Sequence, residues 1–205
     1  MNRVVILGGG GHAHVVVEIL REMGTVDLVG VLDPDAGLRD VLGVPRLGSD
    51  DLMAALAAAR TTGAVAAVGD NRARRELFER MLRSGLTPFN AVHPSAVVSR
   101  SASLGRGLVI AANAVVNALC RLGDNVIVNT SATIDHHGSI GDHVHVAPGC
   151  HLAGSVTVGE STLLGVGVTV TPGVSIGARV FVRAGAIVTR DVADDARVAS
   201  EREED

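Results

Sequence analysis

The chain has 205 residues, which is enough for one large domain or two small ones with a buried core. Its formal net charge of −4 offers no basic surface for nucleic acid or for an anionic membrane. Hydrophobic residues make up 47% of the chain, but there is no Trp, no Tyr and only three Phe, so the core must be aliphatic. Gly and charged residues interrupt every apolar run before it could span a membrane, and we therefore expect a cytoplasmic protein.

Strand and helix patterns alternate through residues 1–91, which predicts a small parallel α/β sheet of the Rossmann type. Short apolar segments at 4–7, 28–32 and 64–68 are the expected strands. One helix is expected directly after the first strand and its glycines, a second at 52–60 and a charged amphipathic one at 72–83. We place the end of this domain before Val92, because His93 and Pro94 mark the start of a different pattern.

A glycine-rich turn separates the first predicted strand from the first helix. Gly8, Gly10 and Ala13 match the pattern G-x-G-x-x-A, and Asp33 ends the second strand about where a ribose-binding acid would lie. Free backbone N–H groups at a helix N-terminus attract a diphosphate, but the pattern does not distinguish a dinucleotide from a nucleotide-sugar. The structural alternative is that the glycines serve only a tight turn. His12 lies at the mouth of the turn, where it could contact a ligand.

A six-residue repeat occupies residues 92–192. Every sixth residue from Val92 to Val188 is Val, Ile or Leu, and the position four residues further on is small or β-branched almost throughout. Three segments of six residues would close one coil of 18 residues, with neighbouring coils about 4.8 Å apart. The repeat predicts a left-handed parallel β-helix. Glycines that follow the large apolar position indicate a corner with positive φ or close backbone approach: Gly105, Gly123, Gly141, Gly159 and Gly177.

Histidines cluster within about one coil of the repeat, at positions 136, 137, 143, 145 and 151. His136 and His137 follow the inward Ile134 and therefore belong to an exposed corner. Gly154 is 18 residues beyond His136, so it should lie directly above that ring. A histidine base beneath a glycine N–H is a workable acyl-transfer pair, because one takes a proton and the other holds an oxyanion. The alternatives are a solvated corner and a zinc site, and we rank zinc well below catalysis.

Several motifs are distributed along the chain beside the glycine-rich start: Gly69-Asp70-Asn71-x-x-x-Arg75, Val92-His93-Pro94, Asn129-Thr130-x-x-x-Ile134-Asp135-His136 and His145-x-Ala147-Pro148-Gly149. Together they resemble the nucleotide-sugar N-acetyltransferases, which include the bacillosamine and perosamine acetyltransferases, with the sialic acid O-acetyltransferases as near relatives. The resemblance covers nearly the whole chain. It implies a homotrimer with active sites between subunits, acetyl-CoA as co-substrate and no metal. The N-terminal domain would bind a UDP- or GDP-linked 4-amino-4,6-dideoxy sugar.

The resemblance also implies roles for single residues. His136 matches the base that removes a proton from the sugar amine as the amine attacks the thioester. Gly154 matches the glycine whose amide meets the thioester carbonyl, and Asp135 and His145 match other active-site positions, the latter beside acetyl-CoA. The residues predicted to bind the nucleotide-sugar, from the glycine loop and the motifs together, are Gly10, His12, Asp33, Asn71 and Asn129.

This chain departs from the family pattern in two places. An acidic residue usually follows the base and orients it, whereas His137 stands there, which leaves Asp135 or a carboxylate from a neighbouring subunit for that role. The family commonly ends in a Gly-x-Pro-Ala segment near the coenzyme, whereas residues 193–205 form an acidic tail that we expect to be disordered. Cys120 and Cys150 fall on small inward positions of the repeat, which favours buried structural roles.

Acetylation of a sugar amine is the leading hypothesis, and O-acetylation of a sugar such as sialic acid is the nearest alternative. A metal-dependent hydratase and an assembly scaffold belong to a different class. An NAD-dependent oxidoreductase is least favoured, because no second catalytic α/β domain follows the glycine loop.

Overall fold

The computed structural model describes residues 1–59 and 63–199, which divide into two compact units. The first unit consists of Met1–Pro94 with Arg106–Val109, and the second of Ser95–Gly105 with the chain from Ile110 onward. No helix within these described residues is long and apolar enough to cross a membrane. Arg60, the predicted end of a helix, and residues 200–205 of the predicted tail lie outside the described residues.

A five-stranded sheet forms the centre of the first unit, in the order β3-β4-β2-β1-β5. Four of its strands are parallel, which confirms the predicted α/β sheet: β1 (Asn2–Leu7), β2 (Val26–Leu32), β4 (Val44–Gly48) and β5 (Gly63–Ala66). β3 (Asp40–Val41) pairs antiparallel with β4 and, like β4, is not among the predicted strands. The turn between them has positive φ at Leu42 and Gly43, but Leu-Gly lacks the Asn or Asp that usually marks such a hairpin.

The helices of the first unit are amphipathic, as their apolar period predicts. α1 covers Gly11–Glu22 and α3 covers Asn71–Arg83, while the helix predicted at 52–60 is the shorter α2 (Met53–Ala58) after a 3-10 turn at Asp50–Leu52. Side chains from α2 and α3 pack against the sheet in one core cluster: Val5, Leu7, Leu32, Met53, Ala64, Phe78, Met81 and Leu86. β6 (Ala91–Val92) lies close to the end of the first segment of this unit, which runs to Pro94.

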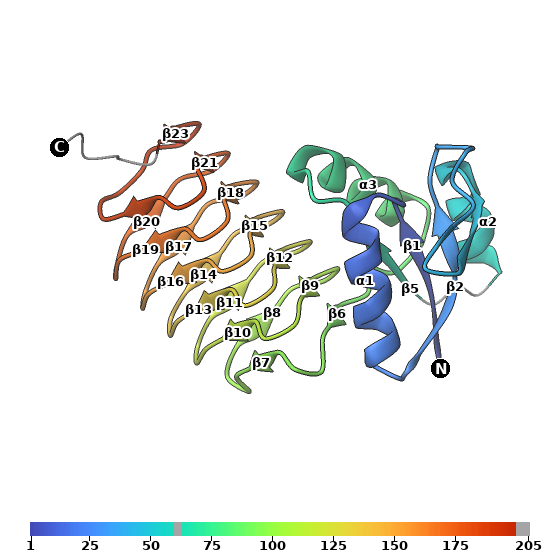
Figure 1. Ribbon diagram of the computed structural model, residues 1–205, viewed down its shortest axis with the longest axis horizontal. Coiled ribbons are helices and arrows are strands. Elements are labelled where there is room, and N and C mark those ends of the chain that lie inside the picture. The colour runs from blue at the N-terminus through green and yellow to red at the C-terminus, as the bar shows by residue number, and fades with distance from the viewer. Residues whose placement is uncertain (60–62, 200–205) are drawn as a thin grey trace. The chain divides into compact units, whose positions relative to one another are not determined.

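The second unit is a left-handed parallel β-helix, whose stacked coils run from green to red in Figure 1. Val115 pairs with Thr133 and Val116 with Ile134, an offset of 133 − 115 = 18 residues that confirms the predicted coil. Its faces are three sheets, in the orders β22-β19-β16-β13-β10-β7, β20-β17-β14-β11-β8 and β23-β21-β18-β15-β12-β9. The strands are β7 (Val97–Val98), β8 (Ser103–Leu104), β9 (Val109–Ile110), β10 (Val115–Val116), β11 (Arg121–Leu122), β12 (Ile127–Val128), β13 (Thr133–Ile134), β14 (Ser139–Ile140), β15 (His145–Val146), β16 (His151–Leu152), β17 (Thr157–Val158), β18 (Leu163–Leu164), β19 (Thr169–Val170), β20 (Ser175–Ile176), β21 (Phe181–Val182), β22 (Ile187–Val188) and β23 (Arg197–Val198).

The glycines that follow the large apolar positions are required by close backbone approach and not by a positive φ. A Cβ atom added to Gly159 would lie 2.5 Å from the backbone nitrogen of Ala178 in the next coil, and one at Gly105 would collide with the Gly123 carbonyl. Within the described residues, positive φ recurs two positions later at the same corners, for example +58° at Asn125 and +60° at His143. Each corner therefore combines a tight stacking position with a left-handed position.

The β-helix continues beyond residue 192, which corrects the predicted start of a disordered tail. β23 pairs with β21, and the offset is 197 − 181 = 16 residues where the earlier coils have 18. Arg179 Nε donates to Asp195 Oδ1 at 2.7 Å and ties this last coil to the one before it. Because this coil is two residues shorter, a strict step of six cannot reach β23.

Candidate active site

Two histidines meet at one corner of the β-helix, directly after β13. His136 and His137 are both exposed, as predicted. His137 has φ +61°, and its amide donates to the Ala118 carbonyl of the preceding coil at 2.9 Å. The two Nδ1 atoms lie 3.0 Å apart, with the ring planes at 88°. The corner therefore presents two imidazoles in direct contact.

Gly154 lies against the ring of His136, where the predicted offset of one coil places it. A Cβ atom added to Gly154 would lie 2.7 Å from Nε2 and 3.2 Å from Nδ1 of that ring, so only glycine leaves room for it. The Ser155 amide donates to the His136 carbonyl at 2.9 Å, which holds the two coils in register. Within the described part of the chain the Gly154 amide donates no hydrogen bond, so the fold itself does not use this N–H.

Asp135 contacts the backbone of His136 and not its ring. Its Oδ1 accepts from the His136 amide at 2.7 Å and from Asn117 Nδ2 at 3.0 Å. Between Asp135 and His137, it is His137 whose side chain contacts the imidazole of His136. Neither Asn117 nor this use of His137 was predicted, since the match to a family motif points to an acid and not to a second imidazole.

Asn129 and His145 come together on another face of the β-helix. Asn129 directly follows β12, and its Nδ2 lies 3.2 Å from Nε2 of His145 on β15. Asn129 Oδ1 accepts from the Thr130 amide at 2.8 Å, which fixes the orientation of the side-chain amide. Both residues are half-buried and form a polar pair at the surface of the β-helix.

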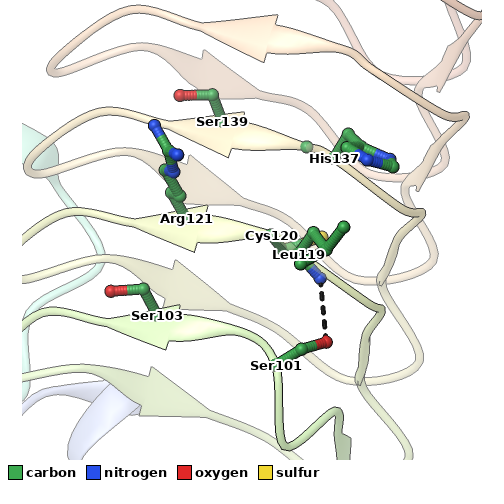
Figure 2. Close-up of a pocket in the computed structure, with 8 residues that line it drawn as sticks. Ser101, Ser103, Leu119, Cys120, Arg121, His137 and Ser139 are labelled. Carbon is green, nitrogen blue, oxygen red and sulfur yellow. Dashed lines mark hydrogen bonds between the residues drawn. The ribbon is translucent and has the colours of Figure 1, made fainter.

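Shallow pockets lie on the two faces beside the histidine corner. One has a volume of about 330 Å³, and Figure 2 shows Ser103, Arg121 and Ser139 above one another on its neighbouring strands, with His137 beside them. The other has a volume of about 360 Å³, and Asp135 is among the residues that line it. The corner is therefore open to ligands from both faces.

Cys120 and Cys150 point into the β-helix and are fully buried, which confirms their predicted inward positions. Burial raises the pKa of both thiols, so neither thiol is poised to form a reactive thiolate. The described residues contain no group of three or more His, Cys, Asp or Glu that could hold a metal ion.

In the first unit the glycine-rich turn joins β1 to α1, as predicted. Gly8 has φ +96°, and Gly10 is the N-cap of α1 with an extended backbone. A Cβ atom added to Gly10 or Gly11 would meet nothing within 4 Å, so open space faces the start of the helix. Asp33 holds this turn, because its Oδ2 accepts from the Gly9 amide at 2.7 Å. A carboxylate in this position shapes the loop, and its predicted contact with a ribose stays a prediction.

Arg74 on α3 is a fully buried cation that was not among the predicted site residues. It donates to the Val68 and Gly69 carbonyls at 3.2 and 3.1 Å and to Asn71 Oδ1 at 2.9 Å, so it orients the predicted Asn71. Burial and the positive charge of Arg74 lower the pKa of His12 to about 4, which makes that imidazole neutral at pH 7. Burial also lowers the pKa of Arg74 itself to about 10.

The sequence does contain a signal for Arg74. It precedes Phe78 by four residues and Met81 by seven, so a helix places all three on one face, and that face is buried. The apolar members of the face predict the helix, and the charged member marks the position where a cation must find carbonyl partners.

Comparison with known proteins agrees with this architecture. Residues 3–81 match the family model of the PglD N-terminal domain, and residues 155–190 match the hexapeptide repeat of succinyl-transferase. Relatives with this architecture are acyltransferases, and this chain belongs to the same class.

Close relatives narrow this class. Perosamine N-acetyltransferase from Caulobacter crescentus, solved as a histidine-to-asparagine mutant with CoA and GDP-perosamine, is 44% identical, with a TM-score of 0.91 over 96% of this chain and 93% of that one. The acetyltransferase domain of PglB from Neisseria gonorrhoeae, in complex with acetyl coenzyme A, is 36% identical, with a TM-score of 0.91 over 96% and 95%. UDP-N-acetylbacillosamine N-acetyltransferase of Bacillus subtilis (strain 168) is 35% identical over 124 residues, 55% of this chain, and this match spans about half (52%) of that relative. The chain belongs to the family of hexapeptide-repeat sugar N-acetyltransferases.

Proposed function

We propose that this protein transfers an acetyl group from acetyl-CoA to the 4-amino group of a GDP- or UDP-linked 4-amino-4,6-dideoxy sugar. The observation that carries this proposal is the packing of the His136 ring on Gly154, beside an amide that the fold does not use. Family membership supports the class of acceptor. The identity of 44% to an enzyme solved with GDP-perosamine, against 35% to the bacillosamine enzyme, favours a GDP-linked sugar.

The reaction is a direct transfer without an acyl-enzyme. The sugar amine attacks the thioester carbonyl carbon, and His136 Nε2 takes a proton from the nitrogen as the N–C bond forms. The negative charge that develops on the carbonyl oxygen is held by the Gly154 N–H. When the C–S bond breaks, CoA leaves as a thiolate and receives the proton from His136. Removal of the proton keeps the nitrogen from leaving again in place of the thiolate.

The other predicted residues then serve binding. The open space at Gly10 takes the diphosphate, and the neutral His12 imidazole can both donate and accept a hydrogen bond near it. Asn71, oriented by Arg74, offers an amide to the same ligand. Acetyl-CoA lies in a groove between two β-helices of a homotrimer and contacts His145. Light scattering of the purified protein should therefore give the mass of three chains.

Thiol release from acetyl-CoA tests the proposed function. GDP-perosamine, a UDP-linked 4-amino sugar and sialic acid are compared as acceptors, and we expect thiol release with the amino sugars and most rapidly with the GDP-linked one. The product must resist hydroxylamine, because amides do and esters do not. Release only with sialic acid, or a product that hydroxylamine cleaves, would show O-acetylation instead. A variant His136→Ala that keeps the full rate would remove the proposed base.

A further inference from the structure

The imidazoles of His136 and His137 face each other through their Nδ1 atoms, 3.0 Å apart. Two such nitrogens can form a hydrogen bond only when one of them carries a proton and the other a lone pair. A neutral histidine has one proton for its two nitrogens, so the state of Nδ1 determines the state of Nε2 in the same ring. The contact therefore couples the protonation of His137 to that of His136.

We propose that His137 is the positioning residue of the base, and that the two rings share one Nδ1 proton. This inference rests on the proposed role of His136. When His136 Nδ1–H donates to His137 Nδ1, the lone pair of His136 lies on Nε2. Nε2 is the ring nitrogen nearer to Gly154, because a Cβ atom added to Gly154 would lie 2.7 Å from Nε2 and 3.2 Å from Nδ1. In this tautomer Nε2 can take the proton of the attacking amine. His137 thus performs with a neutral acceptor what an adjacent carboxylate would perform with a charged one.

Backbone hydrogen bonds hold the main chain at both histidines. The His137 amide is bound to the Ala118 carbonyl at 2.9 Å, and the His136 carbonyl accepts from the Ser155 amide at 2.9 Å. The Asp135 carboxylate contacts the backbone of His136 and not its ring, because Oδ1 accepts from the His136 amide and from Asn117. In this chain, the side chain that contacts the His136 imidazole is that of His137.

A neutral partner differs from a carboxylate in its response to protons. A proton added to the pair leaves one lone pair, which the Nδ1···Nδ1 hydrogen bond retains, so both Nε2 atoms carry hydrogen and the base is lost. A carboxylate in place of His137 would stabilise the His136 imidazolium, and the base would then be lost at higher pH. The activity of the wild-type enzyme should therefore extend to lower pH than that of a variant with an acid at position 137.

Other ionisable groups around the pair are few within the described residues. The Asp135 carboxylate adjoins His136 through its backbone, and Arg121 lines the same pocket as His137. Cys120 also lines that pocket, and burial raises the pKa of its thiol, so it stays protonated. Asp135 and Arg121 are both kept in every variant compared below, so a difference between variants reports the residue at position 137.

The experiment compares three variants with the wild-type full chain. His137→Gly removes the imidazole and suits φ +61°, since glycine occupies the equivalent left-handed position at other corners, for example Gly149 and Gly173. His137→Asp restores an acceptor, and Asp tolerates this conformation. Asn113→Gly, at an exposed corner with φ +57°, is the matched control for a glycine at such a position.

We expect kcat with saturating amino sugar and acetyl-CoA to fall about fivefold to tenfold in His137→Gly, the factor that corresponds to one net hydrogen bond. KM for both substrates should stay the same, because the ring orients the base and does not bind substrate. In His137→Asp, kcat should recover and the acid limb of kcat/KM should move to higher pH. Asn113→Gly should behave as wild type in rate and in pH profile.

Two outcomes would overturn the inference. One is a His137→Gly variant with wild-type kcat and pH profile, and the other is a His137→Asp variant whose acid limb does not move. His136→Ala separates this failure from that of the proposed function. If His136→Ala loses the rate while His137→Gly keeps it, only the positioning role of His137 is wrong. If His136→Ala keeps the rate, the base itself is wrong.

Discussion

The two units hold their candidate residues by different means. In the β-helix, the backbone register alone places Gly154 against His136, and the same register fixes every other corner. In the first unit, single side chains do this work: Asp33 binds the Gly9 amide, and Arg74 binds two carbonyls and Asn71. In the repeat, the backbone position of a residue such as His137 is therefore set by the register and does not depend on which side chain is present. In the first unit, the position of the loop or of Asn71 depends on the side chain that binds it.

The largest effect on the transfer rate is expected at Gly154, which the register of the β-helix places against the His136 ring. Gly154→Ala would put a Cβ atom 2.7 Å from His136 Nε2, and because His136 is exposed, its ring can move out of the way without unfolding the coil. We expect the transfer rate to fall by about 10²- to 10⁴-fold, the contribution of a positioned base, while the melting temperature changes little. Thiol release and thermal unfolding measure the two quantities.

The control for this variant is a double-mutant cycle with His136→Ala. If the alanine acts through the ring, Gly154→Ala should cost nothing further once the ring is gone. Additive losses would show that residue 154 acts independently of His136. The contact between Gly154 and the His136 ring, which the register of the β-helix creates, would then not account for the effect of Gly154→Ala.

The sequence predicts the positions of residues in the β-helix better than it predicts the contacts of the first unit. The step of six predicts the β-helix, the exposure of His136 and the position of Gly154, because a repeat converts a sequence offset into a spatial contact. It does not reach β23, where the coil is two residues shorter. In the first unit the glycine pattern locates the loop, but the role of Arg74 depends on carbonyls that only the fold brings to it. The contact between two imidazoles at one corner likewise depends on side-chain rotamers, which the register does not determine.

The next largest effect is a pH dependence of the stability of the first unit, caused by His12. The pKa of His12 is lowered to about 4, below the value of about 6.5 expected in the unfolded chain, so the unfolded state binds the proton more tightly. The stability that depends on a neutral His12 is fully present above pH 6.5 and is lost as the pH falls towards 4. A shift of this size corresponds to about 3 kcal/mol.

Urea unfolding of the wild type and of His12→Gln between pH 4 and pH 7 measures this dependence, since other titrating groups cancel in the difference. The wild type should lose stability relative to the variant as the pH falls. His14→Gln, an exposed histidine two residues away on α1, is the matched control and should follow the wild type. Parallel curves for His12→Gln and the wild type would mean that His12 is not held neutral by the fold.

A smaller effect is expected at Arg74. Arg74→Met keeps most of the side-chain volume but leaves the Val68 and Gly69 carbonyls without their donor, at a cost of about 2 kcal/mol in unfolding free energy. Asn71 loses its orienting partner as well, so KM for the nucleotide-sugar should rise while kcat stays the same. Arg72→Met removes an exposed arginine of the same helix, which pairs with the exposed Glu76, and should change stability by less than about 0.5 kcal/mol. Equal behaviour of the two variants would contradict the dependence of the first unit on the hydrogen bonds of Arg74.

The smallest effect is expected for the two buried thiols. In the β-helix Cys120 Sγ donates to the Asp135 carbonyl and Cys150 Sγ to the Gly165 carbonyl, each at 3.0 Å, and both side chains are fully buried in the interior. The double variant Cys120→Ala/Cys150→Ala should lose about 1 kcal/mol of stability per site through the small cavities left behind, with a transfer rate within about twofold of wild type. Iodoacetamide should label both thiols in urea and neither in the folded protein. A rate loss of tenfold with unchanged stability would show that a buried thiol takes part in the chemistry. It would also show that the interior of the β-helix does more than set the register of its corners, because the carbonyl that Cys120 binds belongs to the residue before His136.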